Sequence, residues 1–349
     1  MIESVTVENF RCYERLRLTG LRRVNVIVGK NGSGKTALLE SLFLAATGHP
    51  QIPLRFRVYR NMGEPVISLE RAGFEALWKD LFFRFDDRRV ISLSISGSPE
   101  NTRSARIYYS SAEEEMMIPL GKKPEDSTAI VPLRFEYHDA SNETTEFVVS
   151  LGQEGLSIKG AAPTMEMSYY PSSMKANPQE AAKRFSELSK TRRAGRVGDT
   201  LSRIYEFVED LSIEVSGQSP FLYASVRGMP EKMKVSLVSE GVFRLMSYLL
   251  GIASQPKGVI LIDEIENGFY YETFPKVWHA LFEFCTEYDT QLFVSSHSLE
   301  CLTAIADFAK GREDHFALLR TVRENGNYAV RQITGEGFRD AIDAGLDIR

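Results

Sequence analysis

The chain contains few of the residues that build disulfide frameworks and metal centres. It has three cysteines and five histidines in 349 residues, and no C-x-x-C or H-x-x-x-H spacing occurs among them. Scattered cysteines that are odd in number do not suggest a disulfide framework and favour a reducing compartment. The composition therefore argues against a zinc-dependent enzyme and predicts a cytoplasmic location.

Long apolar runs and an excess of basic charge are also missing. No stretch approaches the roughly eighteen apolar residues of a membrane span, and the N-terminus, with Glu3 and Glu8, lacks the apolar centre of a signal peptide. The formal net charge is −5, so any nucleic-acid binding must be local. With 43% hydrophobic and 26% charged residues, the chain is typical of globular proteins with one large or two modest domains. We expect no membrane partner.

A glycine-rich turn near the N-terminus carries the strongest motif. The segment VNVIVGKNGSGKTALLE fits the pattern G-x-x-x-x-G-K-[ST], with Gly29, Gly34, Lys35 and Thr36 in register. Glycines let successive N–H groups converge on phosphate oxygens at a helix N-terminus. Lys35 is expected to reach the β and γ phosphates, and Thr36 to place its hydroxyl on Mg²⁺. The predicted nucleotide contacts are Gly29, Asn31, Gly32, Ser33, Gly34, Lys35, Thr36 and Ala37.

Two later apolar strands end in side chains suited to phosphate hydrolysis. The strand GVILI is followed by Asp263 and Glu264. Acids are common where strands meet solvent. In a chain that carries the glycine-rich phosphate-binding loop (P-loop) described above, however, Asp263 is expected to hold Mg²⁺ and Glu264 to orient or deprotonate the attacking water. His297 follows the strand QLFVSS. A lone histidine there is usually structural, and the alternative that we favour is a sensor of the γ-phosphate or the water.

Two further features near the nucleotide chemistry allow two interpretations each. Ser239 and Gly241 open an apolar helix, where Ser239 is a good N-cap. The functional alternative is that this helix N-terminus meets a γ-phosphate bound by a second protomer. Arg11 follows the first predicted strand, either as an ordinary strand end or as a contact to the bound nucleotide.

The middle of the chain changes character. A helix is expected near residues 69–83, and alternating or β-branched runs over 89–170, from RVISLSIS to MEMSYY, predict antiparallel strands and hairpins. Residues 178–211 predict two helices broken near Gly195 to Gly198. This segment carries a basic cluster, which predicts either a solvated helical face or a contact to a phosphate backbone. The cluster comprises Lys183, Arg184, Lys190, Arg192, Arg193 and Arg196.

The order of these motifs resembles that of the ABC-type ATPases. The N-terminal VENFRCYERLRL with the P-loop resembles the start of the branch that contains SMC, RecF and the overcoming-lysogenization-defect (OLD) ATPases. The segments LVSEGVFRLMSYLLGIA, GVILIDEIENGFYY and QLFVSSHSLECL look most of all like OLD-type ATPase domains, and the tail FALLRTVRENGNYAVRQITGEGFRDAIDAG is similar to that group. The resemblance covers roughly residues 1–50 and 230–345.

The resemblance implies an α/β fold, namely a P-loop NTPase of ABC-ATPase type with a parallel-rich nucleotide lobe, an antiparallel β lobe and a helical insertion. The ATPase head would comprise residues 1–50 and 230–349, and the insertion residues 51–229, with strands over 89–170 and helices over 178–210. The residues implied in catalysis and binding are Lys35 and Thr36 at phosphate and metal, Asp263 and Glu264 as the Walker B pair, Ser239 and Gly241 as the signature, His297 as the switch histidine, and 266–268 as the D-loop.

Three departures from the family pattern affect what can be carried over. The signature VSEGV lacks the second glycine or the glutamine of transporter ATPases, and Gln51 is the nearest candidate for a Q-loop glutamine, which cannot be assigned. The chain also ends soon after His297 without a D-x-D acid pair. We therefore expect no TOPRIM-type nuclease domain.

The leading hypothesis is a Mg²⁺-dependent ATPase, working as a homodimer that hydrolyses ATP in composite sites between two heads. It would drive a DNA-related or anti-phage defence activity through a separate nuclease or toxin effector chain. The alternative is a RecF-like, ATP-gated DNA clamp or loader, to which the basic cluster could supply contacts. A transporter motor is disfavoured because LSGGQ is missing, and a GTPase because no N-K-x-D motif follows the P-loop.

Overall fold

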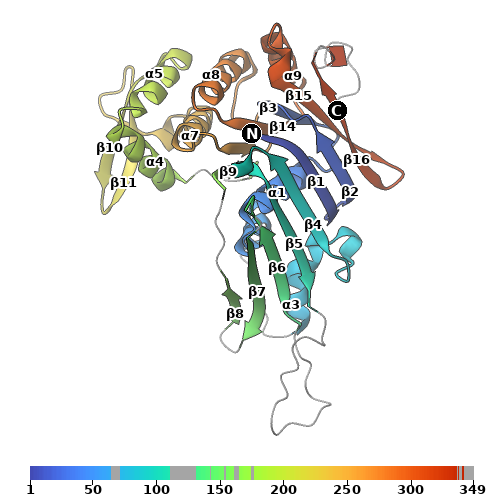
Figure 1. The fold of residues 1–349 in the computed structure, drawn as a ribbon. Coiled ribbons are helices and arrows are strands. Elements are labelled where there is room, and N and C mark those ends of the chain that lie inside the picture. The colour runs from blue at the N-terminus through green and yellow to red at the C-terminus, as the bar shows by residue number, and fades with distance from the viewer. Residues whose placement is uncertain are drawn as a thin grey trace.

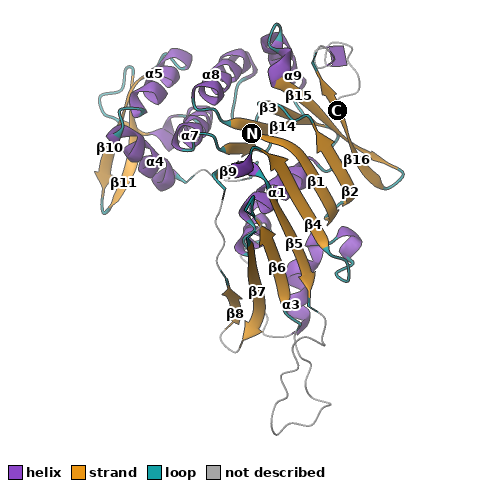
Figure 2. Ribbon diagram, viewed as in Figure 1, coloured by secondary structure: helices purple, strands orange, loops and turns teal. Residues whose placement is uncertain are grey.

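The computed structural model describes residues 1–63, 71–110, 131–141, 143–152, 155–160, 165–173, 177–335, 337 and 340–341. Within these residues the strands form three sheets, of which two are large and share helix α1 between them (Figures 1 and 2). No helix in these ranges has the length and apolarity needed to cross a membrane. The architecture agrees with the α/β fold class predicted from the sequence.

The first large sheet is mostly parallel and carries the P-loop. Its strand order is β16-β15-β3-β14-β13-β9; β15, β3, β14, β13 and β9 run parallel, and β16 pairs antiparallel with β15. The strands β3, β13 and β14 are buried at every residue, which explains why they read as continuous apolar runs. The bounds are β3 (Val24–Val28), β9 (Met167–Tyr170), β13 (Val259–Ile262), β14 (Gln291–Ser296), β15 (Phe316–Glu324) and β16 (Asn327–Thr334).

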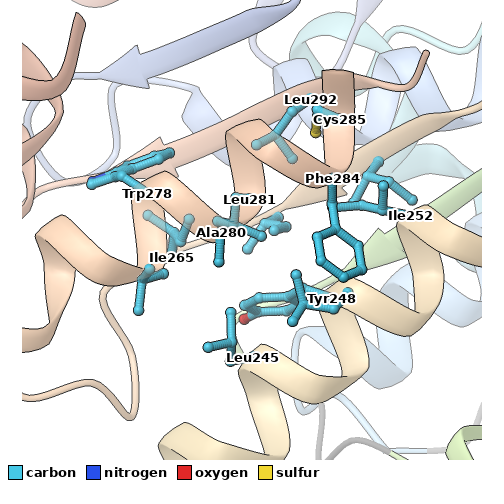
Figure 3. Close-up of a cluster of buried hydrophobic side chains, with 14 of the residues drawn as sticks. Leu245, Tyr248, Ile252, Ile265, Trp278, Ala280, Leu281, Phe284, Cys285 and Leu292 are labelled. Carbon is cyan, nitrogen blue, oxygen red and sulfur yellow. The ribbon is translucent and has the colours of Figure 1, made fainter. Parts of the chain in front are cut away.

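Helices cover one face of this sheet. Figure 3 shows Tyr248 and Ile252 of α7 packed against Leu281 and Phe284 of α8. Each such side chain contributes about 1.5–3 kcal/mol when it is fully buried, so this layer holds the strands that carry the site. The helices over this face are α7 (Glu240–Ser254), α8 (Phe274–Glu287) and α9 (Leu299–Ala309), and α4 (Pro178–Lys190) and α5 (Ala194–Ile204) pack against α7.

The other face of the parallel sheet packs on α1 (Lys35–Thr47), the helix that follows the P-loop. Successive strand residues point to opposite faces, so Val26 belongs to the core under α7 and Ile27 to the core around α1. Every residue of α1 except Thr36 is buried, because the second large sheet covers its other side. This explains why apolar residues occur on every side of the helix instead of along one stripe.

The second large sheet is antiparallel, in the order β2-β1-β4-β5-β6-β7-β8. Its strands from the middle of the chain confirm most of the runs predicted between residues 89 and 160. The N-terminal strands β1 and β2 join the same sheet, because β1 pairs with β4, so the sheet draws on both sides of the boundary expected at residue 50. The bounds are β1 (Ile2–Phe10), β2 (Tyr13–Thr19), β4 (Ile91–Gly97), β5 (Arg103–Tyr109), β6 (Leu133–His138), β7 (Thr144–Gly152) and β8 (Gly155–Lys159).

The antiparallel assignment of the last run, MEMSYY, is wrong. Its strand β9 pairs in parallel with β13, from Met167 beside Val259 to Tyr170 beside Ile262. The run is short, and its alternation does not tell which sheet it joins. The pairing places the carboxyl end of β9 beside the Walker B strand.

The helical insertion also differs from the prediction. The break between α4 and α5 falls at residues 191–193, where Arg192 has a φ of 60°, and Gly195 and Gly198 lie inside α5. Glycine costs about 1 kcal/mol in a helix interior, and burial of Val197 and Leu201 against the helical layer offsets this cost. Residues 233–238, MKVSLV, are mostly a helical turn. The adjoining elements are β10 (Val208–Ser216), β11 (Ser219–Val226), β12 (Met233–Lys234) and α6 (Val235–Val238).

Two short helices follow α1. Three residues separate the end of α1 from the start of the helix α2 (Gln51–Tyr59). The helix expected near residues 69–83 is α3 (Arg71–Trp78) followed by 3-10 turns at Lys79–Leu81 and Phe83–Phe85. Its first two expected residues, 69 and 70, lie outside the described residues. These elements pack against the antiparallel sheet and α1, with Trp78 fully buried.

Candidate active site

The predicted P-loop joins β3 to α1 and has the backbone that its glycines permit. Gly29, Gly32 and Gly34 have φ values of 146°, 74° and 106°, which side-chain-bearing residues rarely adopt. A side chain at Gly29 would also collide with the main-chain and hydroxyl oxygens of Thr321, and one at Gly34 would lie 2.7 Å from the hydroxyl of Tyr13. Both glycines are therefore required by space as well as by backbone conformation.

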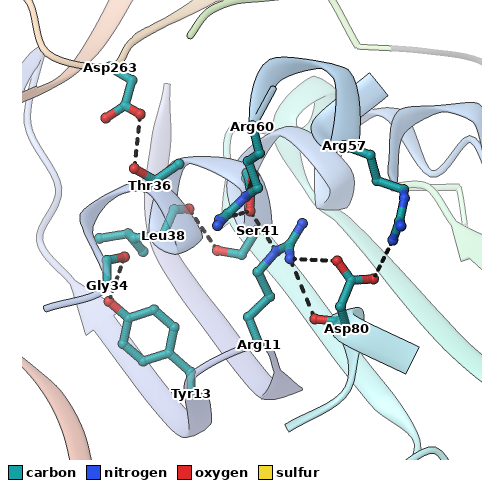
Figure 4. Close-up of polar contacts among 11 residues, drawn as sticks. Arg11, Tyr13, Gly34, Thr36, Leu38, Ser41, Arg57, Arg60, Asp80 and Asp263 are labelled. Atoms are coloured by element: carbon teal, nitrogen blue, oxygen red, sulfur yellow. Dashed lines mark hydrogen bonds and ion pairs between the residues drawn. The ribbon is translucent and has the colours of Figure 1, made fainter. Parts of the chain in front are cut away.

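Hydroxyl groups from two other strands hold the P-loop in place. The hydroxyls of Ser33 and Thr321 lie 2.5 Å apart, and Thr321 on β15 also donates to the carbonyl of Val28 at 3.0 Å. Tyr13 on β2 donates to the carbonyl of Gly34 at 3.2 Å (Figure 4). The sequence did not predict the roles of Thr321 and Tyr13, because single hydroxyl residues in strands form no recognisable pattern.

Lys35 lies across the P-loop. Its Nζ donates to the carbonyls of Gly29 at 2.6 Å and Lys30 at 3.3 Å. Burial lowers the pKa of the Lys35 ammonium, and the nearby carboxylate of Asp263 opposes this shift. The ammonium is thus already held inside the loop, where it can contact phosphate oxygens.

The other predicted contacts of the turn offer mainly their backbone. Asn31 is exposed at the turn, whereas the side chain of Ala37 is buried in the core around α1. The N–H of Leu38 donates to the carbonyl of Gly34 at 3.0 Å. The N–H groups before it belong to the first helical turn, which provides no partners within the helix, so they are available to an anion.

Thr36 and Asp263 meet directly, although they are 227 positions apart. The hydroxyl of Thr36 donates to Asp263 Oδ2 at 2.9 Å (Figure 4). The hydroxyl of Ser295 on β14 donates to Asp263 Oδ1. Burial raises the pKa of the Asp263 carboxyl, and the hydrogen bonds from Ser295 and Thr36 work against that shift. The predicted metal ligands therefore share one buried polar site.

Glu264 leaves the sheet in an uncommon backbone conformation. Its φ is 53°, in the left-handed region, and its N–H donates to the hydroxyl of Ser295 at 2.8 Å. Its carboxylate accepts a hydrogen bond from Asn267 Nδ2 at 3.0 Å. Backbone strain at a predicted catalytic residue is a common feature of active sites.

His297 is fixed by a neighbouring acid. Glu266 Oε1 accepts the backbone N–H of His297 at 2.8 Å and lies 2.7 Å from its Nδ1. The ring is 47% exposed, whereas the Glu266 side chain is nearly buried. A proton on Nδ1 is held by this carboxylate, so Nε2 is the ring atom available to a ligand. The sequence placed Glu266 in the D-loop and did not predict this contact.

The predicted signature helix contacts the D-loop of its own chain. Ser239 has an extended backbone and caps α7 by accepting the N–H of Val242 at 3.1 Å. A side chain at Gly241 would lie 2.6 Å from the carbonyl of Gly268. The capping interpretation is confirmed, and the contact to a γ-phosphate stays a prediction.

Arg11 points into an ion-pair network instead of toward the P-loop. Its Nε lies 2.6 Å from Glu40 of α1, and its Nη1 lies 3.2 Å from Asp80 (Figure 4). Gln51, the Q-loop candidate, begins α2 beyond the C-terminal end of α1. A helix of 13 residues spans about 20 Å, so Gln51 is remote from the P-loop.

The basic cluster of residues 183–196 is largely paired with acids. Arg184 contacts Glu180 at 3.0 Å, and Lys190 contacts Glu187 at 3.0 Å. Arg196 contacts two acids of α8, Glu283 and Glu287, which the local sequence could not indicate. Lys183 and Arg192 stay exposed. The pairing favours the solvated-face interpretation, and contact with DNA stays a prediction.

Asp263→Asn is expected to stabilise the nucleotide-free protein. An acid whose pKa is raised by folding binds its proton more tightly in the native state, so its contribution to stability falls as the pH rises from the unfolded pKa through the folded pKa. At neutral pH the charge of Asp263 therefore costs stability, and asparagine removes that cost. Thermal unfolding without ligand should show a higher midpoint for the variant at pH 7, with the difference shrinking in acid. A lower midpoint at pH 7 would contradict the expectation.

Comparison with known proteins finds related sequences and a related fold. A protein-family model described as "AAA domain, putative AbiEii toxin, Type IV TA system" matches residues 24–302. An "ATP/GTP phosphatase" of Helicobacter pylori is 20% identical and aligns over 97% of each chain. The "DNA replication and repair protein RecF" of Idiomarina loihiensis is 39% identical over 16% of this chain and 16% of its own. The crystal structure of an SMC head bound to the C-winged helix domain of ScpA superposes with a TM-score of 0.52 at 12% identity, over 96% of this chain and 98% of that one.

Proposed function

This chain belongs to the AAA-domain family whose model it matches and is an ABC-type ATPase of the branch that contains SMC and RecF; from that premise we propose that it hydrolyses ATP with Mg²⁺ in composite sites between two copies of itself. The observation that carries the proposal is the 2.9 Å contact between Thr36 and Asp263, which joins the P-loop to the Walker B strand. We also propose that the chain belongs to the OLD-type group of these ATPases and works in the cytoplasm.

The donor set at Thr36 and Asp263 fits Mg²⁺. A hydroxyl and a carboxylate are hard oxygen ligands, and Mg²⁺ takes one or two such protein ligands and completes its shell with waters and phosphate oxygens. Among the described residues no group of three or more His, Cys, Asp or Glu side chains is placed to hold a metal. When bound, Mg²⁺ neutralises charge that develops on the phosphates.

The protein groups divide the remaining work. Lys35 and the N–H groups of the first turn of α1 bind the triphosphate. Glu264, held by Asn267, accepts a proton from the attacking water. His297, held by Glu266, directs Nε2 toward the terminal phosphate or that water. These side chains reach one site because β3, β13 and β14 are parallel and end at one edge of the sheet.

Exposed apolar side chains support a second copy at the signature helix. Leu237 lies two residues before Ser239 and is 69% exposed, and Tyr270 and Tyr271, just after the D-loop, are 61% and 52% exposed. The D-loop contacts the first turn of α7 through Gly268, so these side chains lie near one corner of the molecule. Large apolar groups gathered on a surface are typical of protein interfaces. A second copy that covered this corner would bring Ser239 to the partner's phosphate.

Ser239→Arg tests the composite site. The side chain of Ser239 caps α7 at the surface, so a bulky cation there should leave the subunit's own P-loop and ATP binding intact while turnover falls to the Glu264→Gln level. Lys35→Ala should also be inactive. If each site combines one P-loop with the partner's Ser239, mixing the two inactive proteins restores one intact site in each mixed dimer. When subunits exchange freely at equal amounts, half of the dimers are mixed, so turnover should recover to about a quarter of wild type. Persistent turnover in Ser239→Arg, or no recovery on mixing, would contradict the composite site.

We further propose that hydrolysis is coupled to a DNA-related or anti-phage defence activity through a separate nuclease or toxin effector chain. The family description, which names a toxin–antitoxin system, supports this idea. The RecF-like alternative, an ATP-gated DNA clamp, is supported by the similarity to RecF over 16% of this chain. Duplex-DNA binding that requires ATP and falls steeply with salt would favour the clamp. Co-purification of an effector would favour the first proposal.

A further inference from the structure

A buried serine on β14 contacts three consecutive residues of the Walker B turn. The hydroxyl of Ser295 donates to Asp263 Oδ1 and accepts the N–H of Glu264 at 2.8 Å. Its main-chain carbonyl accepts the N–H of Ile265 at 3.0 Å. Ser295 is fully buried, so water does not replace these contacts. One side chain therefore ties the proposed metal ligand to the backbone of the proposed base.

The contact to Glu264 matters because this residue has an uncommon backbone. A non-glycine residue with a φ of 53° stays in that conformation only when its surroundings hold it there. The N–H of Glu264 points toward β14 and finds its partner in the Ser295 hydroxyl. Without that hydroxyl, the N–H and one oxygen of Asp263 both lose a partner in a buried place. The turn could then relax, and the carboxylate of Glu264 would move with it.

We propose that Ser295 is a positioning residue for ATP hydrolysis, which sets the direction of the Glu264 carboxylate relative to Asp263 and Thr36. The inference rests on the proposed function, because it assigns Ser295 a role in the same site. Ser295 is fully buried and acts through its two neighbours, Asp263 and Glu264. Its removal should therefore slow the chemical step more than it weakens ATP binding, since Lys35 and the P-loop amides remain.

The next residue provides a matched control. Ser296 is also fully buried at the end of β14, but successive strand residues face opposite sides. Its hydroxyl accepts the N–H of Ser298 at 3.2 Å, in the turn before α9 (Leu299–Ala309). Ser295→Ala and Ser296→Ala remove the same atom from adjacent buried positions, so they separate loss of positioning from general loss of packing.

The test compares steady-state turnover and ATP affinity of the full chain for wild type and for the variants Ser295→Ala, Ser295→Thr and Ser296→Ala. Ser295→Ala should lower kcat by about 10- to 100-fold, with the Kd for a fluorescent ATP analogue within about threefold of wild type. Ser295→Thr keeps the hydroxyl and should restore most of kcat. Ser296→Ala should retain wild-type kcat. Ser295→Cys, which keeps the size but bonds weakly, should be slow and serves if the alanine variant does not fold.

The outcomes distinguish the role of Ser295 from the proposed function of the whole site. Equal kcat for Ser295→Ala and Ser296→Ala, a folded Ser295→Thr as slow as the alanine variant, or a loss of ATP binding that matches the loss of kcat would overturn the role of Ser295. In any of these cases the proposed function stands, provided that wild type turns over ATP and Glu264→Gln does not. No turnover by wild type, or full turnover by Glu264→Gln, would overturn the proposed function itself.

Discussion

Glu264→Gln is expected to lower steady-state ATP turnover by about 10²- to 10⁴-fold, the usual contribution of a general base, and to leave ATP binding intact. Glutamine has the shape of glutamate but cannot take a proton from water. Its amide oxygen can still accept the hydrogen bond that Asn267 donates to Glu264 in the native site. The N–H bond to Ser295 is a main-chain contact and is also kept. The substitution therefore removes the base and preserves its placement.

The measurement is phosphate release at saturating ATP together with the Kd of a fluorescent ATP analogue. Glu187→Gln is the control, because Glu187 is an exposed acid of α4 that pairs with Lys190 at 3.0 Å; its turnover should stay at the wild-type level. Asn267→Ala removes the partner of the base and should fall between the two. Turnover within threefold of wild type for Glu264→Gln would remove this residue from the role of base.

The site could be predicted from the sequence where its chemistry is local. The P-loop is a run of consecutive residues whose glycines and Lys35 are recognisable together, and the structure gives its three glycines positive φ values. The strands β3 and β13 were predictable because both faces of a parallel sheet are buried, which leaves a continuous apolar run. Asp263 follows such a run directly. The position of Asp263 after an apolar strand, in a chain that carries a P-loop, was enough to predict that it shares a metal site with Thr36.

The parts that could not be predicted depend on contacts between distant segments. The hydroxyls of Thr321 and Ser295 each belong to a single strand residue, and a serine or threonine within a strand is common in any sheet. Arg11 precedes the P-loop, and the sequence left open whether it is an ordinary strand end or a contact to the nucleotide. Its actual partners are Glu40, on a helix whose burial on all sides left no polar stripe to notice, and Asp80, which lies in a 3-10 turn. Side-chain pairing of this kind is fixed only when the sheets and α1 are assembled.

The acid at the centre of that network carries the second large expected effect. Glu40 is 1% exposed on α1, and its carboxylate lies 2.6 Å from Arg11 and 2.9 Å from two nitrogens of Arg60 (Figure 4). Asp80 joins the network through Arg11 at 3.2 Å and Arg57 at 3.4 Å. The network thus ties α1 to α2, to the turn after β1 and to the 3-10 turn that carries Asp80.

Glu40→Ala is expected to lower the free energy of unfolding by about 3–5 kcal/mol, because it leaves the guanidinium of Arg11 buried without its main partner. Urea unfolding measures the loss. Glu187→Ala is the control, since Glu187 forms an exposed pair with Lys190 at 3.0 Å and such pairs contribute less than about 1 kcal/mol. The double variant Glu40→Leu with Arg11→Met should recover much of the loss, because apolar side chains can replace a buried ion pair. If the double variant were as unstable as Glu40→Ala, packing around α1 and not the unpaired charge would account for the loss.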